Sequence, residues 1–492
     1  MLRPWVLNVA IDRNSAVAIH AQIADQIIDA IHNERFRPGT ALPGSRELAK
    51  KIKVNRKTVI QAYDELIAQG WLISENKRGT FVSSKSQRSK PSTMPHKLSK
   101  LSLVSSSIES INHANKGVHE HLHFNEGWAD NRLLPFEAIS RAMRHALIAS
   151  TRYQQSYFTD PKGHLDLRLA IVEMLNLERG LQASSANLCL LSNSQMAIFV
   201  IAKTLIQKDE YVVFEELSDP MARQAFLNCG ANILTIAHDD NGIDIINLEL
   251  LCLQYKIRAI YLRPQQQTPT NTRLSDKRRQ QLLEMAEQYH FLIIEDDSRQ
   301  EYNFSDRATL PIASQSKSSK LIYIGSATTL LGEGLNSSFI VADEEKIKQC
   351  ATQAYLMAGI GNPICQIALA ELLRNGEVKR HRARSLKLYR ERKNHVIALL
   401  RDELFDFAHF KLPESTLAIW LTLHTTINMA KLQADAETKN VSFIPASYYS
   451  TSNHQIPAIR LGYAHLNEAE LSLGIQRLKS AFMLQQSHLL RA

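Results

Sequence analysis

Cysteine and long apolar runs are both scarce in this sequence of 492 residues. Its five cysteines show no paired or CxxC spacing and their number is odd, which indicates a reducing compartment. No apolar run approaches the roughly 20 residues of a membrane span, because Lys203 interrupts the longest candidate, 196–206, where we expect a buried helix. The first ten residues lack a long apolar core, so we expect a cytoplasmic protein with no secretory signal and no membrane contact.

What is present indicates a folded chain of more than one domain. Apolar residues make up 44% and charged ones 22%, which is ordinary for globular proteins, and one core rarely grows beyond roughly 250–300 residues. The net charge of +9 is uneven: residues 1–100 hold 17 Lys and Arg against 8 acids, whereas residues 101–492 hold 41 of each. A polyanion-binding module on a neutral body would have this distribution, as would a basic but inert surface.

The N-terminal pattern predicts three helices followed by a hairpin. Isoleucines from Ile19 to Ile31 recur at spacings of about three and four, which predicts a helix that ends near the basic stretch 35–38. We expect Ser45 to cap a second helix, 46–52, and Asn55 to cap a third, 56–69, which Gly70 ends. Two strands, 71–74 and 79–83, follow on either side of a basic turn. These are the ingredients of a helix-turn-helix with a wing.

Polar and cationic residues gather where such a module meets DNA. A recognition helix offers its first side chains to base edges in the major groove, and an arginine bonds guanine through two parallel hydrogen bonds. Ser45, Lys57 and Thr58 are expected to hold phosphates. For any single basic residue, a solvated surface role is the alternative. The expected contacts are Ser45, Arg46, Asn55, Arg56, Lys57 and Thr58, with Lys77 and Arg78 of the wing in the minor groove.

The stretch RPGTALPGSRELAKKIKVNRKTVIQAYDELIAQGWLISENKRGTFV resembles the winged helix-turn-helix of GntR-type bacterial regulators, and the resemblance covers residues 15–83 without a gap. It implies that Ser45, Arg46, Arg56, Thr58 and the wing around Gly79 touch double-stranded DNA. It also implies that two copies read a paired or repeated operator. We therefore expect a DNA-binding domain over residues 1–83.

Beyond this domain we expect a linker and a larger α/β body. Residues 84–121 are rich in Ser, Lys and Pro and predict a flexible linker, with a short structured subdomain as the alternative. From 122 to 492, helical stretches alternate with short apolar strands, which predicts a mostly parallel sheet with helices on both faces and a small α+β region from about 380. The expected strands are 188–191, 211–214, 232–235, 259–262, 291–294, 321–324 and 338–341.

Several segments of the body resemble fold-type I aminotransferases. YFTDPKGHLDLRLAIVEML, RAIYLRPQQQTPTNTRLSDKRRQQLLEMA, FLIIEDDSRQEYNF, RHRARSLKLYRERKNHVIALL and IRLGYAHLNEAEL follow in family order. A GntR-type head joined to such a body is the layout of MocR-type regulators. This resemblance spans nearly the whole chain and implies a homodimer.

The resemblance implies pyridoxal 5'-phosphate as cofactor, with no metal. Asp296, at a strand end, matches the acid that faces the pyridine nitrogen, and capping a loop is its alternative role. Arg460 matches the arginine that clamps a substrate carboxylate, for which a structural ion pair is the alternative, and it is the expected effector-binding residue. The other residues expected to line the cofactor pocket are Ser194, Gln195, Ser326, Thr328 and Thr329.

The pocket departs from the family at the residue that carries the chemistry. Thr329 stands where the family has its Schiff-base lysine, and a hydroxyl forms no imine. Asn336 replaces a phosphate-binding arginine, Asn193 a loop glycine, Asp219 a ring-stacking tyrosine and Ser298 another tyrosine. Lys317 and Lys320 belong to the start of the preceding strand. These departures argue against a covalently bound cofactor, and we expect no catalytic residue.

Three hypotheses follow for the whole chain. The first is a homodimeric DNA-binding regulator whose degenerate aminotransferase-like body senses an amino-acid-like or vitamin B6-like effector. The second is an active pyridoxal-phosphate-dependent aminotransferase with a DNA-binding head, which needs an amine that the sequence does not obviously supply. The third is a body that only dimerises the heads.

Overall fold

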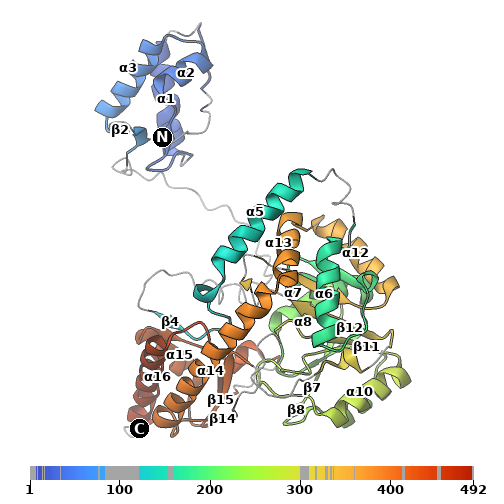
Figure 1. Ribbon diagram of the computed structural model, residues 1–492. Helices are drawn as coiled ribbons and strands as arrows, with labels where there is room; N and C mark the ends of the chain where they lie inside the picture. The colour runs from blue at the N-terminus through green and yellow to red at the C-terminus, as the bar shows by residue number, and fades with distance from the viewer. Residues whose placement is uncertain are drawn as a thin grey trace. The chain divides into compact units, whose positions relative to one another are not determined.

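The computed structural model describes residues 7–83, except 8, 14, 16, 34, 76 and 77, and residues 121–489, with gaps. The gaps are 153–159, 300–309, 316–317, 327–330, 333–334, 336, 360, 413–415 and 452–455. The chain divides into two compact units, Met1–Ile108 and Glu109–Ala492 (Figure 1). The division falls within the predicted linker, of which only residue 121 is described.

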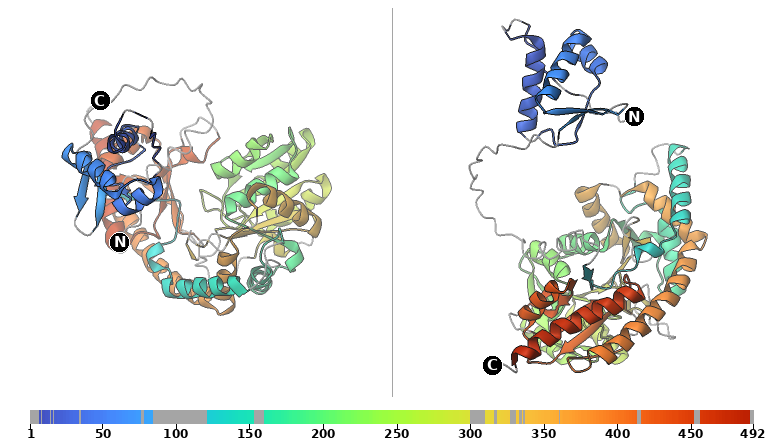
Figure 2. Two further views of the ribbon diagram at one scale, coloured as in Figure 1. Left: turned by 90° about the horizontal axis from the view of Figure 1, so that it is seen from above. Right: turned by 90° about the vertical axis from the view of Figure 1, so that its left-hand side faces the viewer.

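Three helices and a small antiparallel sheet make up the described part of the N-terminal unit (Figures 1 and 2). Helix α1 (Ile19–His32) packs against α3 (Arg56–Ala68), and α3 packs against α2 (Ser45–Ile52). Strands β1 (Ala41–Leu42), β2 (Leu72–Glu75) and β3 (Gly79–Val82) form the sheet in the order β1-β3-β2. The apolar periodicity produced this core, because the isoleucine face of α1 and the inner face of α3 are buried in it.

The predicted helix starts are right for α3 and wrong for α2. Asn55 caps α3, since its side chain accepts a hydrogen bond from the backbone N of Lys57. Ser45 does not cap α2: Gly44 occupies that position, and Ser45 is the first residue of the helix. The Ser45 hydroxyl instead accepts a hydrogen bond from Arg56 Nε at 3.3 Å. A partner from the next helix therefore determined the position of this serine.

A seven-stranded sheet forms the centre of the larger unit, in the order β5-β13-β12-β11-β10-β6-β7. All neighbouring pairs are parallel except the two that involve β13, so the predicted mostly parallel sheet is confirmed. The strands are β5 (Leu188–Leu191), β6 (Tyr211–Glu215), β7 (Asn232–Ile236), β10 (Ile257–Leu262), β11 (Leu292–Asp296), β12 (Leu321–Ser326) and β13 (Ser338–Val341).

Both faces of this sheet are covered, which explains why its strands are continuous apolar runs. Along β6, Val212 and Phe214 pack on one face, together with residues of α7, α8 and α12, while Val213 packs on the other, with residues of α6 and α10. The predicted buried helix is α7. The helices of this region are α5 (Phe136–Arg152), α6 (Leu165–Glu178), α7 (Ser194–Leu205), α8 (Pro220–Asn228), α9 (Ile245–Gln254), α10 (Asp276–Tyr289), α12 (Glu344–Ala358) and α13 (Pro363–Arg374).

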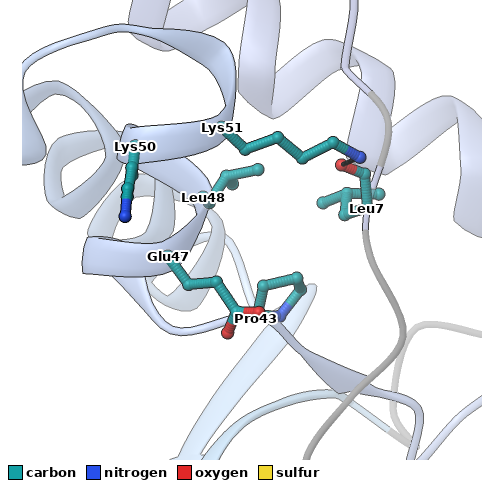
Figure 3. Close-up of a pocket in the computed structure, with 6 residues that line it drawn as sticks. All are labelled: Leu7, Pro43, Glu47, Leu48, Lys50 and Lys51. Atoms are coloured by element: carbon teal, nitrogen blue, oxygen red, sulfur yellow. Dashed lines mark hydrogen bonds between the residues drawn. The ribbon is translucent and has the colours of Figure 1, made fainter.

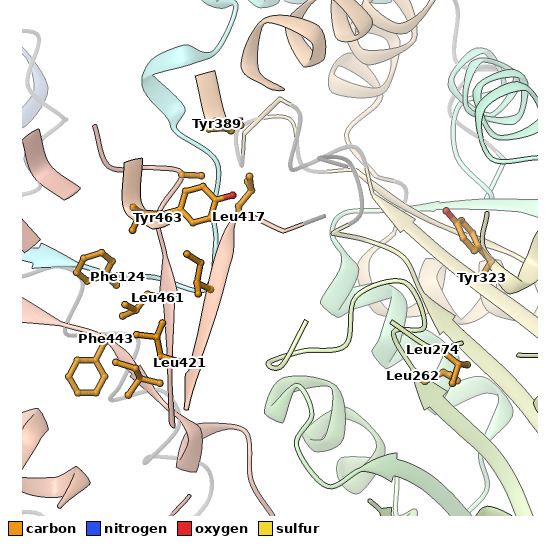
Figure 4. Close-up of a cluster of buried hydrophobic side chains, with 14 of the residues drawn as sticks. Phe124, Leu262, Leu274, Tyr323, Tyr389, Leu417, Leu421, Phe443, Leu461 and Tyr463 are labelled. Carbon is orange, nitrogen blue, oxygen red and sulfur yellow. The ribbon is translucent and has the colours of Figure 1, made fainter. Parts of the chain in front are cut away.

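The C-terminal part is the predicted smaller α+β region. An antiparallel sheet in the order β14-β15-β18-β17 lies with the described helices α14, α15 and α16. One apolar cluster continues from this sheet, at Leu421 and Leu461, to the large sheet, at Leu262 and Tyr323 (Figure 4). The elements are α14 (Glu377–Glu403), β14 (Ala408–Phe410), β15 (Ala418–Leu423), α15 (Met429–Thr438), β17 (Ile444–Pro445), β18 (Ala458–Gly462) and α16 (Glu468–Leu489).

Two short pairings complete the fold. Strand β4 (Leu122–His123) pairs in parallel with β16 (Val441–Ser442), and β8 (His238–Asp239) pairs with β9 (Gly242–Ile243). Among the residues that the structure describes, no helix combines the length and the apolar character that crossing a membrane requires.

Candidate functional site

The start of α3 presents an exposed polar and cationic surface. Asn55, Arg56 and Lys57 are exposed and Thr58 is half-buried, while Val59, the next residue, is fully buried. The helix is thus anchored by its inner face and offers its first turn to a partner. Arg46, on α2, is also exposed. The predicted DNA contacts of both helices are therefore accessible.

A hydrogen-bond network holds the two helices of this motif together. Arg56 Nε donates to Ser45 Oγ, which joins the first residue of α3 to the first residue of α2. Tyr63, on the buried face of α3, donates its hydroxyl to the carbonyl of Pro43 at 2.8 Å. Near the other end of α2, Lys51 Nζ donates to the carbonyl of Leu7 at 3.0 Å, beside a pocket lined by Leu48 (Figure 3). Helix α2 is therefore fixed at both ends.

The wing is only partly described. Arg78 is exposed, forms an ion pair with Glu75 of β2, and lies over the ring of Phe81 with its Cζ atom 5.7 Å from the ring centre. Gly79 has φ +127°, a conformation that L side chains rarely adopt. Lys77 lies outside the described residues. The structure contains the predicted hairpin, and its Arg78 forms an ion pair with Glu75.

In the body, several polar residues collect at one edge of the large sheet, among them Asp296 and Ser326, which the sequence singled out. The carboxyl ends of β6, β10, β11 and β12 meet there because these strands are parallel. Asp296 and Ser326 end their strands, Arg263 follows β10, and Asp219 caps α8 after β6. This edge is where ligands bind in open α/β folds.

Asp296 is buried there among hydrogen-bond donors. Its Oδ2 accepts from Arg263 Nε at 2.9 Å, from Arg263 Nη2 at 2.7 Å and from the Tyr261 hydroxyl, and its Oδ1 accepts from the backbone N of Ser298 at 2.9 Å. Burial alone would raise the pKa of Asp296, but Arg263 and these hydrogen bonds hold it below its ordinary value. Asp296 is therefore an ionised carboxylate whose counter-ion is part of the chain.

Arg263 also contacts a second acid. Its Nη2 lies 3.3 Å from Asp219 Oδ2, and its Nη1 donates to Thr268 Oγ1 at 3.0 Å. The side chains of Arg263, Asp219 and Asp296 are 7%, 13% and 0% exposed. The sequence identified Asp219 only as a replacement for a tyrosine of the family, and it did not identify Arg263. The available signal was an arginine directly after a buried apolar strand, in YLRP.

Of the other predicted pocket residues, Gln195 and Ser326 contact backbone carbonyls, and Ser194 is placed only as the first residue of a helix. Ser194 starts α7, whose cap is Asn193, and Gln195 Nε2 donates to the carbonyl of Met221 at 2.9 Å. The Ser326 hydroxyl is buried and lies 3.4 Å from the carbonyl of Ser337. Thr328 and Thr329 lie outside the described residues. Their predicted roles remain predictions.

Arg460 is fully buried in the middle of β18. It donates to the backbone carbonyls of Glu126 and Pro269 and to Asn271 Oδ1 at 2.8 Å. None of these groups is a carboxylate, and burial lowers the pKa of Arg460. The hydroxyl of Tyr449, also buried, has no hydrogen-bond partner among the described residues. Arg299, whose side chain is 35% exposed, pairs with Glu126 at 2.7 Å.

Lys320 cannot stand in for the lysine that the family places beyond β12. It precedes the first residue of β12, whereas Ser326 is the last, so the two lie at opposite ends of a strand roughly 20 Å long at 3.3 Å per residue. Its Nζ forms an ion pair with Glu287 at 2.9 Å. Lys317 lies outside the described residues. The structure therefore gives Lys320 a structural partner away from the candidate pocket.

Comparison with known proteins agrees with both units. Residues 19–82 match the model of the bacterial regulatory proteins of the gntR family. The chain is 24% identical to the uncharacterized HTH-type transcriptional regulator YdeL of Bacillus subtilis over 96% of this chain and 99% of that one. It is 26% identical to the probable rhizopine catabolism regulatory protein MocR of Rhizobium meliloti over 97% of each.

The body has an aminotransferase fold. It is similar to LysN, the α-aminoadipate aminotransferase of Thermus thermophilus, with a TM-score of 0.71 and 23% identity, over 78% of this chain and 96% of that one. That enzyme was solved with N-(5'-phosphopyridoxyl)-L-leucine.

The fold and the matches thus define a class of protein: a helix-turn-helix protein with an aminotransferase-like body. Relatives that span its whole length are HTH-type transcriptional regulators, MocR among them, which confirms the GntR and MocR resemblance.

Proposed function

We propose that the protein is a homodimeric transcription regulator that binds double-stranded DNA through α2, α3 and the wing. The observation that carries the proposal is the exposed first turn of α3, with Arg56 held by Ser45 above a buried helix face. Asn55, Lys57, Thr58 and Arg46 complete the proposed contact surface, with Lys77, Arg78 and Gly79 at the wing. Phosphate contacts position such a helix and base contacts specify the sequence.

An exposed apolar surface supports the proposal of a homodimer. Phe136, Leu147 and Ile148 on α5 are 59%, 54% and 47% exposed, and Leu356 near the end of α12 is 73% exposed. Large apolar side chains exposed on the surface of a folded protein are candidates for burial by a partner. A second copy of this chain is the proposed partner, because the operator is expected to be paired or repeated.

The body would sense a small effector with a carboxylate group. Arg460 is a buried cation without a carboxylate partner among the described residues. The buried hydroxyl of Tyr449 has no hydrogen-bond partner among them. A carboxylate accepts from both kinds of donor. An amino-acid-like effector would therefore act on the heads by favouring one of two arrangements of the dimer, which requires different affinities for the two.

Selection from genomic DNA fragments with the purified full chain tests this function. We expect enrichment of fragments with paired or repeated half-sites, whose affinity falls steeply with salt because basic side chains displace counterions from the phosphates. Fluorescence anisotropy of a selected site, repeated with amino acids added, then measures the effect of an effector. The double variant Arg56→Ala, Lys57→Ala is the control. Selection without enrichment, or equal enrichment by the control, would contradict the proposal.

A further inference from the structure

The fold family implies a cofactor whose pyridine ring needs a carboxylate acceptor, and Asp296 is the residue that matches it. When bound, pyridoxal phosphate would supply a protonated ring nitrogen at this carboxylate. Whether the described residues fit that ring depends on the acceptor capacity of Asp296, on whether Arg263 can move aside and on the local charge.

The Oδ2 atom of Asp296 has no acceptor capacity left. An ionised carboxylate offers about four lone-pair positions. The Tyr261 hydroxyl and two nitrogens of Arg263 donate to Oδ2, and the backbone N of Ser298 donates to Oδ1. Three donors already share the roughly two lone-pair positions of Oδ2, so a pyridinium N–H at this oxygen would have to displace Tyr261 or Arg263. Oδ1 keeps one position beside the Ser298 N–H, and there the charge of Arg263 decides.

Arg263 is not free to move aside. Beyond Asp296, its guanidinium contacts Thr268 Oγ1 at 3.0 Å and Asp219 Oδ2 at 3.3 Å. Swinging it out would leave two buried carboxylates, Asp296 and Asp219, without this cation, and unpaired buried charge is strongly unfavourable.

The charges lead to the same conclusion. A pyridinium at Asp296 would bring a second cation next to the Arg263 guanidinium, and like charges in a buried site repel strongly. The described residues therefore do not fit the pyridine ring of the family's cofactor. This misfit is independent of Thr329, since the loss of an imine-forming lysine would by itself leave non-covalent binding open.

We propose that Arg263 replaces the cofactor: its guanidinium is the permanent counter-ion of Asp296, and the body folds and serves the regulator without pyridoxal phosphate. This inference deepens the proposed function by narrowing the effector class. A vitamin B6-like effector is excluded from the Asp296 site, whereas an amino-acid-like effector at Arg460 is not.

Thermal unfolding of the full chain with pyridoxine 5'-phosphate tests the proposal. This probe keeps the ring nitrogen and the phosphate but has no aldehyde, so surface lysines cannot capture it as imines. A ligand that binds the native state raises the unfolding temperature, so we expect a shift below about 1 °C for the wild type at millimolar probe. A saturable rise at micromolar probe would overturn the proposal.

The variant Arg263→Ala is the protein that the probe is expected to stabilise. It leaves Asp296 without its cation, so we expect a lower unfolding temperature than in the wild type, partly restored by the probe. The matched control is the double variant Arg263→Ala, Asp296→Asn, which lacks the acid and should not respond to the probe. A single variant that unfolds like the wild type, that is not stabilised by the probe, or whose response the double variant shares, would overturn the role of Arg263.

A second comparison covers the case in which Arg263→Ala does not fold. Arg263→Met with Asp296→Asn removes both charges and should yield folded protein where the single change does not. Equal loss of folded protein in the single and the double variant would overturn the proposal. Operator binding by wild-type protein without the probe is measured separately, so its failure would contradict the proposed function and not the role of Arg263.

Discussion

Replacing Arg56 by alanine is expected to weaken binding to a selected operator about 5- to 150-fold, a loss of about 1–3 kcal/mol. Arg56 is the first residue of α3 and is exposed, so its removal disturbs no core contact. Its Nε is held by Ser45 Oγ, while the remaining guanidinium nitrogens extend from the first turn of the helix. If they bond a guanine, the variant will also discriminate less sharply between bases at one position of each half-site.

Arg37→Ala is the matched control for this prediction. Arg37 is exposed, lies in the segment between α1 and α2, and carries the same charge. We expect the control to lose only the small, salt-dependent attraction that any surface cation contributes. Anisotropy titrations of the selected operator and of a mutated operator measure both variants. Equal affinity and equal site preference in Arg56→Ala and the wild type would remove Arg56 from the set of base-reading residues.

Replacing Arg179 by alanine is expected to lower the free energy of unfolding of the body by about 3–5 kcal/mol, the cost of breaking a buried ion pair. Arg179 follows α6 and pairs with Asp297, whose side chain is 1% exposed and also accepts the Tyr323 hydroxyl at 2.7 Å. Burial raises the pKa of Asp297 even with Arg179 present. Without Arg179 the carboxyl group must remain a buried charge or take up a proton.

A neighbouring ion pair provides the control for Arg179. Arg382 pairs with Glu178 at 2.6 Å, but both side chains are about 30% exposed, at 29% and 33%. Arg382→Ala should therefore cost less than about 1 kcal/mol. In the double variant Arg179→Ala, Asp297→Asn, part of the lost stability should return because no unpaired charge remains. Urea denaturation measures all three variants, and an equal cost for Arg179→Ala and Arg382→Ala would refute the prediction.

Much of the fold could be predicted because it depends on short-range patterns. Isoleucine spacing indicated α1, Asn55 and Gly70 bracketed α3, and the apolar runs at β5 and β13 had the bounds that the structure shows. Each of these signals arises from residues a few positions apart. The start of α2 was misjudged because a serine and a glycine are both acceptable caps, and the contact between Ser45 and Arg56 decided between them.

The candidate ligand site was only half predictable. Asp296 was found because an acid at the end of an apolar strand lies at the ligand-binding edge of an α/β sheet. Arg263 was missed because it is 33 positions from Asp296 in the sequence. The parallel pairing of β10 with β11 places Leu262 opposite Glu295. The residues that follow them, Arg263 and Asp296, are therefore neighbours in space.

The sequence by itself determined that a basic helix-turn-helix head precedes an aminotransferase-like body, since charge, periodicity and motif order are properties of the chain. Only the tertiary structure decided what Asp296 is for. Strand pairing brings the Arg263 guanidinium onto this carboxylate. A buried charge is stable only beside an opposite charge, and the fold decides which one that is. Asp296 is thus retained from the pocket of the enzyme family, but its counter-ion is Arg263 of the same chain.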